Sequence, residues 1–168
     1  SILNDDCIAE IHLRNLSVRV AKAPTGPAPE GLCVRDNKIY VANSGLGDLR
    51  SKEEGAGTVS ILDARDLRIV NTIPGLPNVM SCTADPQRNR VWIVYRHLAS
   101  QPDSLGGVVL YDPTANTIID HQRYNSPKGL VVDQQSGRIY ILHRAGIDAY
   151  DHTTRTTLYI LLGSHAEL

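Results

Sequence analysis

Six polar residues stand at the ends of short apolar runs, where their side chains can reach a ligand. They are Glu30, Asn43, Arg96, Lys128, His143 and Arg144. The guanidinium groups of Arg96 and Arg144 suit carboxylates or phosphates, because a planar pair of donors matches two oxygen atoms. Glu30 could ligate a hard cation, and His143 could serve as a ligand. The alternative for each residue is that it hydrogen-bonds the loop backbone and meets solvent.

No catalytic motif accompanies these residues. The chain has no Gly-x-Ser-x-Gly sequence, and none of its serines has the context of a nucleophile. Its cysteines, Cys7, Cys33 and Cys82, show no C-x-x-C or C-x-x-H spacing, which argues against a zinc site or a thioredoxin-type pair. The sequence therefore predicts no catalytic residue, no metal site and no cofactor.

The apolar runs that position these residues repeat along the chain. Residues 38–42, 90–94 and 138–142 each place a β-branched residue and then an aromatic residue after a basic one, which is typical of a strand. A second family of runs, at 58–63, 107–112 and 146–151, ends on an Asp that can open a turn. One more β-rich run follows each, at 68–73, 116–121 and 155–161. A unit is therefore four short strands, A to D.

These units divide the whole sequence. Residues 1–27 match strands C and D alone, residues 28–75, 76–125 and 126–163 form three full units, and residues 164–168 begin another. Four short antiparallel strands with this period are typical of β-propeller blades. A β-sandwich also has short strands but needs no self-similar unit of this length. We predict an all-β fold of four-stranded antiparallel propeller blades in an incomplete ring, with a half-blade at residues 1–27 and one domain in all.

The repeat resembles a known family. Pro29-Glu30-Gly31, "IYVANSG" and "TVSILDARDLRIVNTIPG" are similar to the YVTN-type β-propeller repeat. The resemblance implies a binding or scaffolding module that is extracellular or periplasmic. It also admits the alternative of a fragment of a lactonase-like or quinoprotein-like propeller enzyme. Metal-dependent propeller lactonases would need acidic ligands at several blades, whereas Met80 and Lys128 occupy the places equivalent to Glu30.

Blade topology predicts where function resides. The insertions 46–56 and 97–105 both fall between strands B and C, so we expect both to be exposed on one face. The six polar residues lie at the same edge, around the mouth of a central channel. We expect a small ligand or a peptide there. The sequence "SKEEG", at 51–55, carries both charge signs and predicts a solvated, mobile loop.

Charge and hydropathy exclude some partners. Lys and Arg number 17 against 18 Asp and Glu, which argues against a general nucleic-acid binder. No apolar run approaches the roughly 20 residues that span a bilayer. Open blade faces at both ends predict that another polypeptide, or flanking residues of the same one, completes the propeller.

Register also predicts the blade interfaces. Tyr40, Trp92 and Tyr140 share one place in strand B, and we expect all three to be core between blades. Cys33 and Cys82 are expected to point to opposite sides of their strands. We therefore expect no two thiols of this chain to be close enough for a disulfide.

Overall fold

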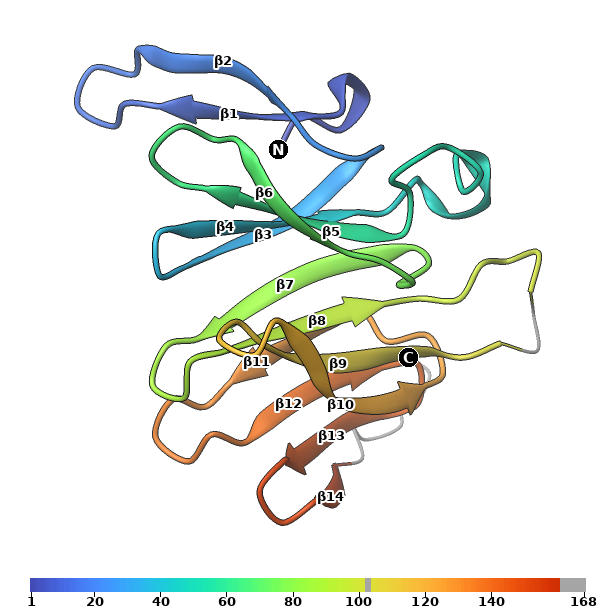
Figure 1. The fold of residues 1–168 in the computed structure, drawn as a ribbon. Helices are drawn as coiled ribbons and strands as arrows, with labels where there is room; N and C mark the ends of the chain where they lie inside the picture. The colour runs from blue at the N-terminus through green and yellow to red at the C-terminus, as the bar shows by residue number, and fades with distance from the viewer. Residues whose placement is uncertain (102–103, 161–168) are drawn as a thin grey trace, which may run out of the picture.

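The computed structural model describes residues 1–101 and 104–160, and its strands form four antiparallel sheets (Figure 1). Three sheets have four strands, one has two, and the strand order in each follows the chain. The sheets are stacked face to face along the molecule in Figure 1, and the described strands do not close a ring. The predicted fold class, propeller blades in an incomplete ring, is confirmed.

Each sheet is one repeat unit. The half-blade holds β1 (Cys7–Ile11) and β2 (Val18–Pro24). Blade 1 holds β3 (Pro29–Arg35), β4 (Lys38–Asn43), β5 (Thr58–Asp63) and β6 (Ile69–Ile73). Blade 2 holds β7 (Val79–Asp85), β8 (Arg90–Tyr95), β9 (Gly106–Asp112) and β10 (Thr117–Tyr124). Blade 3 holds β11 (Gly129–Val132), β12 (Ile139–His143), β13 (Gly146–Asp151) and β14 (Thr156–Ile160).

Helix is almost absent, as the lack of helical periodicity predicts. Two single 3-10 turns, η1 (Leu3–Asp5) and η2 (Gly47–Leu49), are the helical elements among the described residues. Within that part of the chain, no helix is long and apolar enough to cross a bilayer. The expected start of a further unit at 164–168 lies outside the described residues.

The turn between strands C and D is repeated in atomic detail. Asp63, Asp112 and Asp151 each accept a hydrogen bond from the backbone N–H two residues ahead, at 2.9, 2.8 and 2.9 Å. Four residues after these turn positions, and after His12, the backbone is left-handed. The residues are Leu16, Leu67, Asn116 and Arg155, with φ of 56°, 59°, 55° and 54°. The predicted Asp turns are confirmed, and the half-blade keeps the same turn without an Asp.

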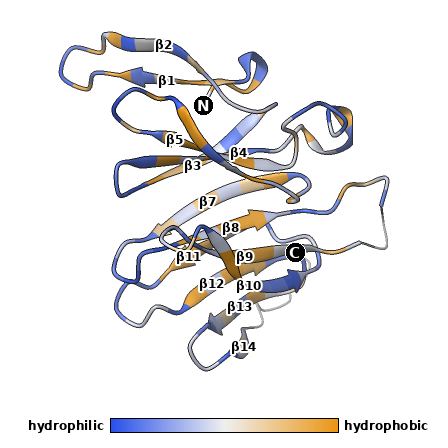
Figure 2. Cartoon of the chain, in the orientation of Figure 1, coloured by the Kyte–Doolittle hydropathy of each residue, from blue (hydrophilic) through white to orange (hydrophobic). Residues whose placement is uncertain are grey.

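Apolar side chains fill the spaces between neighbouring sheets. Figure 2 shows hydrophobic residues along β8 and β9 in the middle of the stack and hydrophilic residues at the turns. Alternate residues of each strand face opposite neighbours. Val91 and Ile93 of blade 2 therefore join the blade 1 cluster, while Trp92 and Val94 join the blade 3 cluster. Both faces of blade 2 are buried, which explains the unbroken apolar runs of its inner strands.

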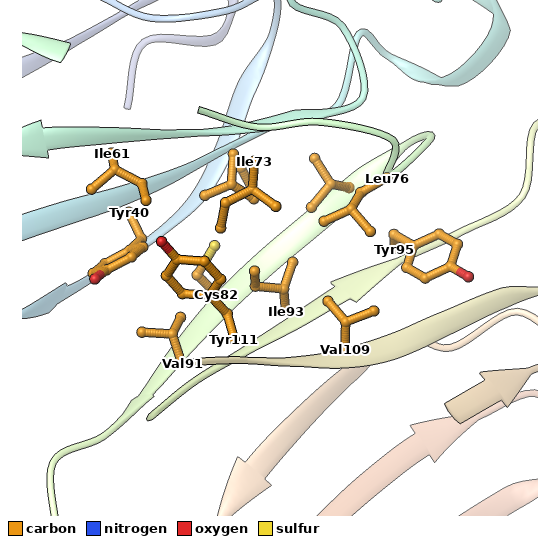
Figure 3. Packing of buried hydrophobic residues seen from close by; sticks show 13 residues of the cluster. Tyr40, Ile61, Ile73, Leu76, Cys82, Val91, Ile93, Tyr95, Val109 and Tyr111 are labelled. Atoms are coloured by element: carbon orange, nitrogen blue, oxygen red, sulfur yellow. The ribbon is translucent and has the colours of Figure 1, made fainter. Parts of the chain in front are cut away.

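At both interfaces between four-stranded blades, an aromatic residue of strand B meets one of strand C. Tyr40 of β4 meets Tyr111 of β9 edge to face, with ring centroids 6.1 Å apart, inside the cluster drawn in Figure 3. Trp92 of β8 meets Tyr150 of β13 in the same way, at 6.4 Å. Strand B of one blade thus presents an aromatic residue to strand C of the next, and the prediction is confirmed for Tyr40 and Trp92.

Tyr140 is the exception. It is 37% exposed, and its neighbours Val131 and Leu142 on the same face are exposed too, because no described blade covers that side of blade 3. The prediction that Tyr140 is core is therefore wrong for this chain. At the other end, Leu32 and Val34 of β3 are exposed because the half-blade has no inner strands to cover them. The chain exposes an apolar blade face at each end of the stack.

Candidate functional site

The two long connections between strands B and C lie at the same edge of the blades (Figure 1). Residues 44–57 join β4 to β5, and residues 96–105 join β8 to β9, with 102–103 outside the described residues. Asp48 links them, because its Oδ2 accepts the Ser100 N–H at 3.0 Å and its Oδ1 accepts the Ser100 hydroxyl. The prediction that both insertions share one face is confirmed. We call the surface formed by these two connections the loop face.

Arg50 organises the first connection. Its guanidinium donates to both carboxylate oxygens of Asp6, at 2.8 and 2.5 Å, and to both of Glu53, at 2.8 and 2.6 Å. Asp6 also accepts the Ala28 N–H at 2.9 Å. The hydrogen bonds from Arg50 hold the pKa of Asp6 below its usual value against the opposing effect of burial. Lys52, Glu53 and Glu54 are all exposed, as expected of a solvated loop, although Arg50 holds the Glu53 carboxylate in place.

A cavity of 190 Å³ lies behind the loop face, between blades 1 and 2. Ser44, Ser51 and Asn78 supply its polar walls, and Leu76 and Leu98 supply apolar ones. The Ser44 hydroxyl donates its hydrogen to the Ala28 carbonyl at 3.1 Å and accepts the Leu46 N–H at 3.0 Å, so it has no hydrogen left to donate to a ligand. Leu49 and Leu105 project from the same loops and are 78% and 42% exposed. The loop face therefore combines a shallow hollow of mixed polar and apolar lining with two exposed leucines.

The six residues singled out by sequence fall into separate environments. Lys128 and Arg144 are exposed, and the Arg96 Nε donates to the Pro127 carbonyl at 3.2 Å, which brings Arg96 beside Lys128. Glu30 is half-buried, and only its backbone oxygen has a recorded partner, the Ser1 hydroxyl at 2.8 Å. Two of the three cationic side chains are thus open to an anion, and the structure does not gather all six into one pocket.

Asn43 is fully buried. Its amide donates to Thr58 Oγ1 at 3.0 Å and to Ser60 Oγ at 2.8 Å, both on β5. These bonds hold the end of β4 to β5 directly below the first connection. In this position Asn43 supports the loop face from underneath.

His143 is enclosed between two tyrosines. Its Nε2 lies 3.2 Å from Asp148 Oδ1, and its ring centroid lies 5.4 Å from that of Tyr124 and 6.2 Å from that of Tyr159. Its side chain is only 9% exposed. Burial and the neighbouring Asp148 carboxylate raise the pKa of Tyr124 to about 12. The cluster holds blade 3 to the outer strand of blade 2.

A second buried polar cluster, absent from the predictions, lies at the same boundary. Asp120 of β10 accepts hydrogen bonds from the Tyr150 hydroxyl at 2.6 Å and Gln122 Nε2 at 3.0 Å, and His152 Nδ1 lies 2.8 Å from it. Burial favours a raised pKa for Asp120, but these three partners outweigh burial and hold it below its usual value. One signal for this cluster in the sequence was Asp120, which stands inside an apolar run. Tyr150 and His152 follow in the next unit.

Neither cluster has the composition of a metal centre. Among residues 1–101 and 104–160, no group of three or more His, Cys, Asp or Glu side chains could hold a metal ion. The Asp120 cluster combines acid, imidazole and phenol, but Tyr150 is buried and bonded on both sides. This arrangement supplies hydrogen-bond partners to the polar atoms that are buried between the two blades.

Comparison with solved structures agrees with this fold. No protein-family model and no curated protein sequence matches the chain. The structure is similar to the Kuenenia stuttgartiensis hydrazine synthase, with a TM-score of 0.77 and 11% identity over 95% of this chain. It is also similar to the dihydro-heme d1 dehydrogenase NirN in complex with DHE, with a TM-score of 0.69 and 18% identity over 95% of this chain.

Both of these proteins contain β-propellers, so the chain is an all-β protein built of propeller blades. It spans 49% of the hydrazine synthase chain and 33% of the NirN chain. At these identities the likeness concerns the fold alone. The finer YVTN resemblance rests on the sequence repeat.

Proposed function

We propose that this chain is a non-catalytic binding or scaffolding module, part of a YVTN-like β-propeller whose loop face meets a partner. The observation that carries the proposal is the Asp48–Ser100 contact, which joins two otherwise independent loops into one surface. Arg50 braces that surface against the half-blade. Loops fixed in this way on a rigid scaffold lose little conformational entropy on binding. Exposed Leu49 and Leu105 give the surface apolar anchors of the kind that proteins bury at interfaces.

The basic residues beside the loop face suit an anionic group. Lys128 and Arg144 are exposed, and Arg96 lies beside Lys128, so a small ligand or a peptide with a carboxylate would find complementary charge at the channel mouth. The Glu30 carboxylate would supply a negative charge on the blade 1 side. This complementarity supports a peptide partner with one acidic end.

The test is site-specific photocrosslinking in the native host. A benzophenone amino acid at Leu49 should capture one discrete partner, and the capture should fall when Asp48→Ala frees the second loop. The same probe at Ile69, which is 46% exposed on the outer strand of blade 1, is the matched control. Equal capture from both positions, or capture unaffected by Asp48→Ala, would show that the loop face is not the binding surface.

A second candidate is an enzyme fragment of the lactonase-like or quinoprotein-like kind. Its support is that both solved structures named above carry the names of enzymes. In that case this chain supplies some blades of an active site that other blades complete. Hydrolysis of simple lactones that Glu30→Gln abolishes would favour this candidate.

The exposed blade faces support completion of the ring. Val131, Tyr140 and Leu142 form an apolar face that another blade would cover, supplied by a different polypeptide or by further residues of the same one. We place the protein in an extracellular or periplasmic compartment because of the YVTN resemblance. Fractionation of the host with antibodies against the chain tests that placement.

A further inference from the structure

The innermost strands of blades 1 and 2 are in backbone contact. A Cβ atom added to Gly31 on β3 would lie 2.7 Å from both the Met80 carbonyl oxygen and the Ser81 Cα on β7. Only a residue without a side chain allows this approach. The two strands therefore converge at the boundary between blades 1 and 2, although they belong to different sheets.

Two thiols face each other beside this contact. Cys33 follows Gly31 by two residues on β3, and Cys82 follows Ser81 on β7. Cys33 packs against the hydrophobic cluster that contains Cys82, so both thiols lie at the boundary between blades 1 and 2 (Figure 3 shows the Cys82 sulfur). As expected, Cys33 and Cys82 point to opposite sides of their strands. Because the two strands belong to neighbouring blades, each residue points toward the other's blade. The structure therefore places both residues at the same blade boundary, apart from Cys7, and all three cysteines of the chain are free thiols.

The two thiols differ in access. Cys82 is 6% exposed, and its interaction with Cys33 together with burial raises the pKa of its thiol well above the usual value. Cys33 is only partly buried, so a small oxidant can reach it. Cys7, the third free thiol, is buried in the half-blade on β1. The pair therefore has an accessible sulfur, which can react first, and a sheltered sulfur beside it.

We propose that Cys33 and Cys82 are a modification site at which a two-electron oxidant of the peroxide class forms a reversible disulfide between blades 1 and 2. Cys33 loses its proton and its thiolate attacks the peroxide, forming an S–O bond as the O–O bond breaks, and the hydroxide that leaves takes up that proton to become water. The Cys82 sulfur then attacks the Cys33 sulfenic sulfur, forming the S–S bond as the S–O bond breaks and releasing a second water. Two thiols are oxidised and one peroxide is reduced. A thiol reductant reverses the step by exchange.

The disulfide would join the two blades at their innermost strands. The residues between Cys33 and Cys82 include β4, β5, β6 and the first half of the loop face. Closing this segment covalently restricts the unfolded chain and the relative movement of the two blades. The inference is independent of the partner proposed above, because it concerns the boundary between blades 1 and 2 and not the loops.

The experiment is a peroxide titration of the reduced protein. Denatured thiol counts should fall from three to one, the mass should fall by two hydrogen atoms, and peptide mapping should join Cys33 to Cys82. The apparent Tm should rise and should return on treatment with dithiothreitol. Cys7→Ser is the matched control. Like the parent, it should lose two hydrogen atoms and join Cys33 to Cys82. Cys33→Ser should prevent the loss of two hydrogens, and Cys82→Ala should leave a Cys33 sulfenic acid that dimedone labels.

Other outcomes overturn the proposal. Oxidation of Cys33 directly to the sulfinic acid in the parent protein would show that Cys82 cannot resolve it. A mapped bond to Cys7, or a disulfide between two chains, would show that the facing geometry does not control the reaction. A linked pair that forms without reversal by dithiothreitol would not be a disulfide.

Discussion

Arg50 and Asp6 form a two-pronged ion pair that fastens the half-blade to the first long loop of blade 1. The residues are far apart in sequence, and the guanidinium matches both carboxylate oxygens. Asp6 adds a bond to the Ala28 N–H, so one carboxylate joins the chain before β1, the loop before β3 and the loop face. The half-blade therefore positions the candidate binding surface as well as covering blade 1.

Asp6→Asn should loosen the first loop without unfolding the protein. The free energy of unfolding should fall by at most about 1 kcal/mol, because Asp6 is about one-third exposed and solvent screens the pair. Hydrogen exchange at residues 48–54 should accelerate. Asp5→Asn is the matched control, since Asp5 pairs only with exposed Lys22 and should leave that loop unchanged.

Low pH should break the ion pair between Arg50 and Asp6. The pKa of Asp6 is lower in the folded protein than in the unfolded chain, so its stabilising effect is present above the unfolded value of about 3.9 and is lost as pH falls through the folded value. Hydrogen exchange at residues 48–54 of the parent, relative to the intrinsic exchange rate at the same pH, should therefore rise below about pH 4. A rise already complete near neutral pH would contradict this assignment.

Asp120→Asn should destabilise the boundary between blades 2 and 3. Removing a buried carboxylate that serves three partners should cost about 2–3 kcal/mol, measured by urea unfolding. Its pKa is lowered on folding, so the parent should lose this stabilisation only as pH falls below the unfolded value of about 3.9. Tyr150→Phe removes one of the three side-chain bonds to the Asp120 carboxylate, together with the bond from Gln122 to the hydroxyl, and should cost about 1 kcal/mol. A cost for Asp120→Asn no greater than that would show that the cluster contributes little.

The two aromatic positions of strand B should respond differently to truncation. Trp92→Ala removes a buried ring that meets Tyr150 and should cost about 3–5 kcal/mol. Tyr140→Ala in the isolated chain should cost under about 1 kcal/mol, because no described blade covers Tyr140. Guanidinium unfolding of both variants checks the difference. Equal costs would mean that Tyr140 is buried in solution.

Asp48→Ala should separate the two loops. Its partners are two groups of Ser100 on exposed loops, so global stability should not change measurably. Hydrogen exchange at residues 98–101 should increase, while exchange in β8 stays slow. An unchanged rate at 98–101 would show that the contact does not order the second loop.

Local pattern predicted the blades well. Asp63, Asp112 and Asp151 open turns through bonds to residues two positions ahead, and such short-range bonds can be inferred from sequence. Alternation along strand B correctly placed Tyr40 and Trp92 at interfaces. It failed for Tyr140 because burial there depends on a neighbouring sheet, which the position in its own strand cannot indicate.

The candidate site was harder to predict. The insertions marked the loop face, but Arg50 and Asp6 meet only through folding, and neither belongs to a repeated position. Asn43 and His143 were correctly placed at strand ends, yet each turns toward its own blade's β5 or β13. The direction in which each of these two side chains points depends on its polar partner on the neighbouring strand. Cys33 and Cys82 point to opposite sides of their own strands and yet both lie at one blade boundary, which cannot be inferred when the sheets are considered one at a time.

The native mass of the protein tests most directly whether these blades are part of a larger ring. Native mass spectrometry of material from its host, with a benzophenone amino acid at Tyr140, reports both the size and the neighbour of the open face. We predict a mass well above the 18.4 kDa of this chain and a crosslink from Tyr140 to a β-strand of a further blade. A stable, soluble species of 18.4 kDa with no crosslink at Tyr140 would contradict the account.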